Sequence, residues 1–136
     1  LQQNVVPIVN ENDTVAVDEL DHETKFGDND QLSAIVATNI GADLLIMLSD
    51  IDGFYDGNPN ADAQAQLLAH VDKVDQRTYE LAGGSGSRFG TGGMVTKLKA
   101  AERMLKANGQ MILANGEDPA IIFQILAGEP VGTLFG

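Results

Sequence analysis

The apolar run Leu44–Leu48 restricts the fold of this 136-residue chain more than any other stretch. Five consecutive apolar residues suit a central strand that is covered on both faces, as in a parallel sheet. The run ends in Ser49-Asp50, and open α/β sheets bind ligands at the carboxyl ends of their strands. The same stretch therefore predicts both a buried sheet and a place for a ligand.

Strand-like and helical patterns alternate along the rest of the chain. Further strands are predicted at 5–9, 67–71, 110–114 and 131–135, with a hairpin at 14–27. Helices are predicted at 28–40, 75–83, 94–108 and 119–127. Strands that alternate with helices indicate an α/β sandwich built around a largely parallel sheet.

A glycine-rich stretch, Gly83–Lys97, leads into the third predicted helix. Backbone N–H groups and the positive end of the helix dipole form an anion site there, and glycine allows a phosphate to approach closely. Lys97, which we place in the first helical turn, can reach the same phosphate. The alternative is a flexible linker. The stretch matches neither the P-loop nor the dinucleotide-binding motif.

Two polar clusters stand beside predicted elements. Asn10–Asp13 follows the predicted strand 5–9, where it can bind a ligand or form an Asx-type turn. Asp28–Asp30 precedes the first helix, where one side chain can serve as the N-cap. Because only one cap is needed, the second cluster leaves side chains for a ligand or a catalytic lysine.

The composition excludes several classes of function. Eight basic residues against 20 acidic ones give a net charge of −12, which opposes non-specific binding to nucleic acid or an anionic membrane. Most of this excess charge is explained by solubility. The chain has no cysteine, and His22 and His70 are isolated, so thiolate and histidine metal sites are not expected. No signal peptide and no membrane-length apolar run is present, which favours a cytoplasmic location.

Five segments occur in an order that resembles the glutamate 5-kinase branch of the amino acid kinase family. They are PIVNEND at 7–13, FGDND at 26–30, LSDIDGFY at 48–55, GTGGMVTK at 90–97 and VGTLF at 131–135. The resemblance covers essentially the whole chain, and GTGGMVTK and the ordered set are its specific parts. It implies a three-layer αβα fold and transfer of the γ-phosphoryl group of ATP, with Mg²⁺, to the side-chain carboxylate of L-glutamate, the first step of proline synthesis.

The resemblance also implies roles for individual residues. Asp13 and Asn29 match glutamate-binding positions, and Asn10 is expected nearby. Lys97 resembles the lysine that stabilises the transferring phosphoryl group, and Asp30 resembles the aspartate that organises catalytic lysines. The implied nucleotide-binding residues are Ser49, Asp50, Thr91, Gly92, Gly93, Met94, Val95, Thr96 and Lys97. A carboxylate nucleophile is already charged at neutral pH, so charge stabilisation and not a strong base is the main requirement.

The family's kinase domain is longer than this chain. It begins with a strand that carries a first catalytic lysine and with a glycine-rich substrate loop, and neither lies within residues 1–136. The RNA-modification-type domain of many bacterial members is also outside this range. We therefore expect residues 1–136 to be the C-terminal, mostly nucleotide-binding part of an amino acid kinase domain, inactive in isolation.

The resemblance leaves partners and alternatives to be tested. A homo-oligomer is expected, and proline is a candidate feedback inhibitor. One alternative is another amino acid kinase with a different acceptor, although NEND and GDND favour glutamate. Another is a non-catalytic nucleotide-binding or assembly module.

Overall fold

The computed structural model describes residues 3–10, 29–83 and 92–136. Its helices are α1 (Asn29–Asn39), α2 (Gln76–Leu81), α3 (Gly92–Lys106) and α4 (Ile121–Leu126). Its strands are β1 (Leu44–Ser49), β2 (His70–Val71), β3 (Gln110–Asn115) and β4 (Thr133–Phe135). None of the helices in these ranges has the length and apolar character needed to cross a bilayer.

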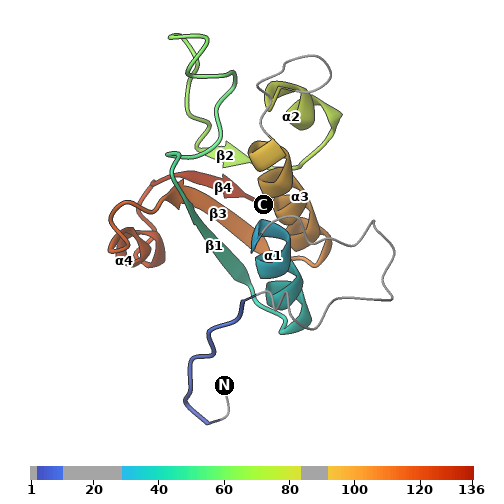
Figure 1. Ribbon diagram of the computed structural model, residues 1–136, viewed down its shortest axis with the longest axis vertical. Helices are drawn as coiled ribbons and strands as arrows, with labels where there is room; N and C mark the ends of the chain where they lie inside the picture. The colour runs from blue at the N-terminus through green and yellow to red at the C-terminus, as the bar shows by residue number, and fades with distance from the viewer. Residues whose placement is uncertain (1–2, 11–28, 84–91) are drawn as a thin grey trace.

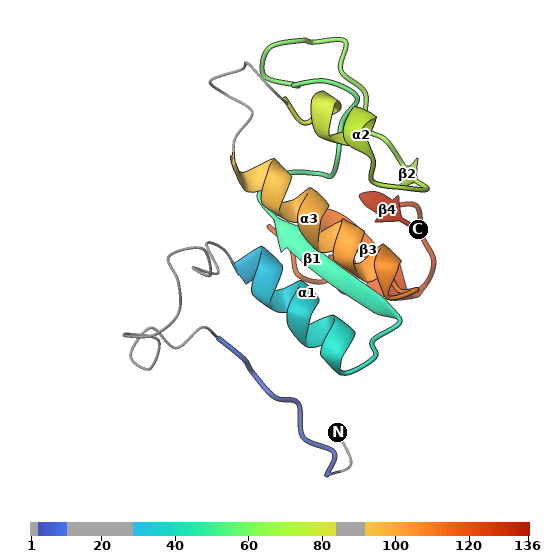
Figure 2. The same ribbon diagram turned by 90° about the vertical axis from the view of Figure 1, so that its right-hand side faces the viewer.

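The four strands form one sheet in the order β1-β3-β4-β2. β1 runs parallel to β3, with Ser49 opposite Asn115, and β2 runs parallel to β4, whereas β3 and β4 are antiparallel. Helices α1 and α3 lie against one face of the sheet, and α4 lies on the other side (Figures 1 and 2). The predicted three-layer arrangement around a mostly parallel sheet is confirmed.

The main core lies between the sheet and the pair α1 and α3. Met47 of β1 and Leu113 of β3 are buried against Leu98 and Met104 of α3 in one apolar cluster. Small alanines on both helices, such as Ala34, belong to the same cluster and let the helices pack closely. Each fully buried large side chain contributes about 1.5–3 kcal/mol, so this layer fixes the positions of both helices on the sheet.

A buried threonine ties the start of β4 to the loop after β1. The Oγ1 atom of Thr133 accepts a hydrogen bond from the backbone N–H of Phe54 at 2.8 Å and donates one to the carbonyl of Leu68 at 2.6 Å. The preceding Gly132 has φ +69°, and a Cβ at this position would collide with the carbonyl oxygen of Leu113. The VGTLF segment therefore holds the loop that follows β1 in place.

Two predictions about the sheet are wrong. β1 was expected to be a central strand, but it lies at the edge of the described sheet, since no described strand pairs with its outer side. Residues 5–9 were expected to form a buried strand, but they have no regular structure, and Ile8 is 98% exposed. A short apolar segment that contains Pro7 becomes a strand only when a neighbouring edge accepts it. The predicted hairpin 14–27 lies outside the described residues.

The helix boundaries are mostly as predicted, with one informative difference at α3, and one predicted strand is shorter than expected. α1 ends just before Gly41, whose φ is +66°, and Asp75 caps α2. α3 begins at Gly92, two residues before its predicted start, which places Lys97 in the second turn and not the first. Only His70–Val71 of the predicted strand 67–71 belongs to the sheet, because Leu67 instead forms an isolated bridge with Tyr55.

Candidate functional site

The connections of the fold bring several candidate residues to one end of the domain. α1 and α3 each lead through a short turn into the strand that follows, so both helices run opposite to β1 and β3. The amino ends of the two helices therefore lie at the same end of the sheet as the carboxyl ends of the two strands (Figures 1 and 2). Ser49-Asp50 and the amino-terminal part of the helix that carries Lys97 both lie at this end.

An ion pair joins the amino-terminal turns of α1 and α3. Lys97 Nζ lies 3.0 Å from Asp30 Oδ2, and each side chain is only 14% exposed. Thr96 Oγ1 lies 2.9 Å from the same carboxylate oxygen, and Gln31 Nε2 donates to the Thr96 carbonyl at 2.7 Å. A charged pair that is mostly withdrawn from water and has additional hydrogen bonds holds its members in one orientation. Asp30 therefore fixes the direction of the Lys97 ammonium group.

The first turn of α3 combines backbone donors with a packing anchor. The helix begins with Gly92 and Gly93, and Thr96 Oγ1 lies 2.8 Å from the Gly93 carbonyl. Met94 packs against the apolar core, and Val95 is half-buried. The two glycines and the helix start are the features expected of an anion-binding turn. Thr91 lies outside the described residues.

Polar side chains gather where β1 and β3 end. Ser49 Oγ donates to Asp50 Oδ1 at 3.1 Å, and the backbone N–H of Gly116 donates to the Ser49 carbonyl at 2.8 Å. Asp52 accepts a hydrogen bond from Asn115 Nδ2 at 2.9 Å. Asp52 and Asn115 were not predicted from the sequence as site residues. The polar residue directly after the predicted strand 110–114 was the available signal, because Ser49 was selected on the same grounds.

The acceptor-site candidates are only partly placed. Asn29 is the first residue of α1 and is exposed beside Asp30, and Asn10 is exposed in the segment 3–10. No hydrogen bond joins Asn10 to Asn29 in these described segments. Asp13 lies outside the described residues.

A hydrogen-bonded group supports α3 from the side of α2. Tyr79 donates to Glu102 Oε2 at 2.9 Å, and Lys106 Nζ lies 2.7 Å from Glu102 Oε1. Burial, assisted by the bond to Glu102, raises the pKa of Tyr79 to about 12. The hydrogen bond from Lys106, followed by that from Tyr79, holds the pKa of Glu102 below its usual value. Nearby, the backbone N–H of Thr78 lowers the pKa of the N-cap Asp75.

Comparison with known proteins decides the family. The sequence profile described as the amino acid kinase family matches residues 1–115, which is most of the chain. The chain belongs to the amino acid kinase family.

Curated relatives of this chain are named glutamate 5-kinase. The chain is 92% identical over its whole length to "Glutamate 5-kinase" of Lactiplantibacillus plantarum and covers 51% of that protein. It is 62% identical over 99% of its length to "Glutamate 5-kinase" of Enterococcus faecalis and covers 50% of that protein. The chain thus spans about half the length of these curated relatives.

Solved structures support the amino acid kinase fold. The T. acidophilum isopentenyl phosphate kinase matches with a TM-score of 0.57 at 24% identity, over 79% of this chain and 38% of that one. The UMP kinase of Bacillus anthracis matches with a TM-score of 0.58 at 19% identity, over 82% and 41% of the two chains. The N-acetylglutamate synthase of Neisseria gonorrhoeae gives 0.60 at 22% identity, over 80% and 23%. At these identities the likeness concerns the fold alone.

The donor set of this amino acid kinase chain suits a metal that is held largely by phosphates. In residues 3–10, 29–83 and 92–136, no three His, Cys, Asp or Glu side chains lie close enough together to hold a metal ion. Asp50 and Asp52 nevertheless follow the end of β1. Mg²⁺ is usually held by one or two carboxylates together with substrate phosphates, and these two side chains fit that pattern.

Proposed function

We propose that this chain is the C-terminal, mostly nucleotide-binding part of a kinase that transfers the γ-phosphoryl group of ATP to the side-chain carboxylate of L-glutamate. The observation that carries the proposal is 92% identity, over every residue, to a protein named glutamate 5-kinase. The paired Asp30 and Lys97, 3.0 Å apart at the ligand end of the sheet, support it, because they suit phosphoryl transfer.

The chemistry requires charge stabilisation at the transferring group. The glutamate carboxylate attacks as an anion, so no proton has to be removed from it. Lys97 would face the phosphoryl oxygens while Asp30 holds its ammonium group in place, and the N–H groups that open α3 would bind neighbouring phosphate oxygens. Mg²⁺, with Asp50 and Asp52 as its protein contacts, would neutralise phosphate charge when bound. Ser49 would contact the nucleotide at the end of β1.

We propose that Asn29 binds glutamate together with Asp13 and Asn10. A substitution of Asn29 tests this assignment. In a full-length protein that carries this chain, Asn29→Ala should raise the KM for glutamate by about tenfold or more, since hydrogen bonds to a charged ligand are lost. The KM for ATP should stay within about twofold of its original value. An equal loss for both substrates would contradict this assignment.

A panel of acceptors separates the proposed enzyme from other members of the family. ADP release should require L-glutamate and should be absent with L-aspartate, N-acetylglutamate, UMP and isopentenyl phosphate. A faster reaction with any of these four would identify a different acceptor. ATP binding without ADP release for every acceptor, in the full-length protein, would favour the non-catalytic module.

The isolated chain of 136 residues should be far less active than a full-length protein. Removal of one electrostatic contact to the transferring phosphoryl group reduces transition-state stabilisation by on the order of 3 kcal/mol, which lowers the rate about a hundredfold to a thousandfold. Comparable ADP release by both proteins would overturn the proposed division of the domain. Adding L-proline to the same assay tests the proposed feedback inhibition, and light scattering tests the proposed homo-oligomer.

A further inference from the structure

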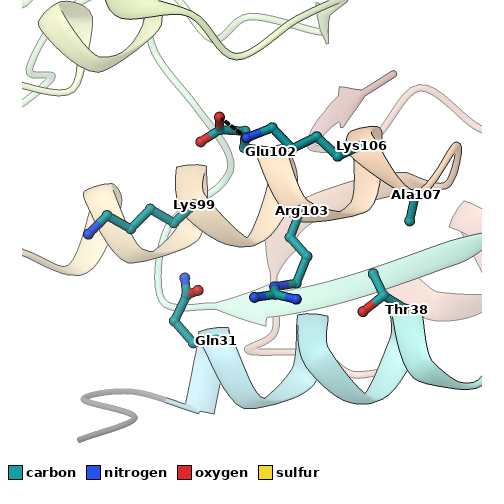
Figure 3. Close-up of a pocket in the computed structure, with 7 residues that line it drawn as sticks. All are labelled: Gln31, Thr38, Lys99, Glu102, Arg103, Lys106 and Ala107. Atoms are coloured by element: carbon teal, nitrogen blue, oxygen red, sulfur yellow. Dashed lines mark hydrogen bonds and ion pairs between the residues drawn. The ribbon is translucent and has the colours of Figure 1, made fainter. Parts of the chain in front are cut away.

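A basic groove lies between α1 and α3 on the outer side of the helical layer. We define the basic groove by Lys99, Arg103 and Lys106 of α3, which face Gln31 and Thr38 of α1 across a cavity of about 600 Å³. In Figure 3, Arg103 reaches between the two helices in front of β1, whereas Lys106 turns towards Glu102. The groove is separate from the Asp30–Lys97 pair.

The charges in the basic groove are mostly uncompensated. Neither Lys99 nor Arg103 has an ion pair with any described residue, whereas Lys106 pairs with Glu102 at 2.7 Å. Three cations and one carboxylate leave a charge of +2 at the groove, in a chain whose net charge is −12. Three of only eight basic residues are therefore gathered on one surface, which attracts an anionic partner more strongly than scattered single charges would.

The spacing of the cations is compatible with an extended polypeptide. Lys99 and Arg103 are four residues apart on one helix, which is about 6 Å along its axis. Side chains at alternate positions of an extended polypeptide are separated by about 6.8 Å. Two carboxylates at alternate positions can therefore contact both cations at once. The carboxamide of Gln31 donates to the Thr96 carbonyl, which leaves its oxygen available to accept a backbone N–H from such a segment.

We propose that the basic groove docks an extended acidic segment of a partner polypeptide. Lys99 and Arg103 are exposed, so the groove is open along its length and does not enclose a ligand as a small-molecule pocket does. Two exposed ion pairs give a salt-sensitive contact of modest strength. The docking does not depend on the proposed kinase activity, since Lys97 is not part of the groove.

The test uses fluorescein-labelled hexaglutamate and a full-length protein that carries this chain, at low ionic strength, with binding followed by fluorescence anisotropy. Monomeric L-glutamate is added at a concentration just sufficient to saturate the proposed acceptor site, so that binding of hexaglutamate there does not contribute to the signal. Lys99→Gln/Arg103→Gln is compared with Lys73→Gln/Arg77→Gln. The control pair has the same residue types and spacing and is also exposed, but Arg77 belongs to α2 and Lys73, which pairs with Asp75, precedes that helix. Circular dichroism verifies the fold of each variant.

The groove variant should bind hexaglutamate about tenfold more weakly, since two ion pairs are lost, and the control should bind as the unmodified protein does. Equal weakening in both variants would show diffuse attraction and overturn the proposal. Absence of hexaglutamate binding by the folded, unmodified protein would also overturn it. Competition by inorganic pyrophosphate at an equal concentration of charges would show a small-anion site instead of a polypeptide-docking groove.

Discussion

The ion pair between Asp30 and Lys97 should be an energetic unit that a double-mutant cycle can measure. At 3.0 Å, with an effective dielectric constant of about 20, the attraction between the two charges is about 5 kcal/mol. Most of this is offset by the cost of removing the two side chains from water, since each is only 14% exposed. The coupling that remains should be about 1–3 kcal/mol.

Asp30→Asn and Lys97→Met should each lower the unfolding free energy. The sum of these two losses should exceed the loss in the double variant. Asp30→Asn keeps the shape of the side chain but leaves a largely buried ammonium group without its carboxylate, at a cost of about 2–3 kcal/mol of unfolding free energy. Urea denaturation of the four full-length proteins, followed by circular dichroism, gives the required differences.

A second cycle provides the control for this measurement. Lys106 and Glu102 form an i,i+4 pair at 2.7 Å in which the lysine side chain is 74% exposed, so their coupling should be about 0.5 kcal/mol or less. Losses at Asp30 and Lys97 that add to within about 0.5 kcal/mol would refute the reasoning, because independent sites behave in that way.

Three further predictions concern stability and ionisation. Gly132→Ala should lower the unfolding free energy by at least about 2 kcal/mol, because Gly132 has φ +69° and a Cβ there would collide with the Leu113 carbonyl. Gly128→Ala should lower it by only about 1 kcal/mol, because the space around a Cβ there is open. Urea denaturation measures both losses. Thr133→Val should lower the unfolding free energy by about 1–3 kcal/mol, because it leaves the buried Phe54 N–H unpaired. Thr133→Ser keeps the hydroxyl and should retain most of the original stability. A Thr133→Val protein as stable as the unmodified one would contradict a role for this hydrogen bond. Tyr79 should ionise near pH 12 and not near pH 10 in absorbance titrations of the folded protein compared with its Tyr79→Phe variant. The contribution of Tyr79 to stability is therefore full below pH 10 and is lost as the pH rises towards 12. A midpoint near pH 10 would contradict the burial of Tyr79 against Glu102.

Local signals in the sequence predicted those features of the fold that depend on neighbouring residues. Asp75 caps α2 through its own turn, and Gly41 follows the end of α1 with a positive φ. Both outcomes depend on the backbone of a few adjacent residues, which the sequence displays directly. The alternation of strands and helices predicted the layered α/β fold for the same reason.

Features that depend on distant pairing were predicted less well. The apolar run of β1 indicated a central strand, but its place at the edge of the described sheet depends on which strands lie beside it. The contact of Asn115 with Asp52 spans 63 residues and requires the parallel register of β1 and β3. Periodicity does not supply that register, so the pairing of Asn115 with Asp52 was not predicted, although the position of Asn115 at a strand end was visible.

The site shows the same division. Lys97 and its glycine-rich approach were visible as a local pattern, but its partner Asp30 lies 67 residues away and was connected to it only through the family resemblance. The spacing of Lys99 and Arg103 was visible as well. The sequence did not show that α1 would pack opposite them and form a groove. The functional roles of the site residues stay predictions.

We propose that Lys97, held by Asp30, stabilises the transferring phosphoryl group. Steady-state ADP release by full-length Lys97→Met protein, with ATP, Mg²⁺ and L-glutamate, measures this contribution. The kcat should fall by about a hundredfold to a thousandfold with little change in either KM, because the contact is made mainly in the transition state. Lys73→Met, which changes an exposed lysine on another surface, should keep the original kcat. A folded Lys97→Met protein with a kcat within about threefold of the original would contradict the claim.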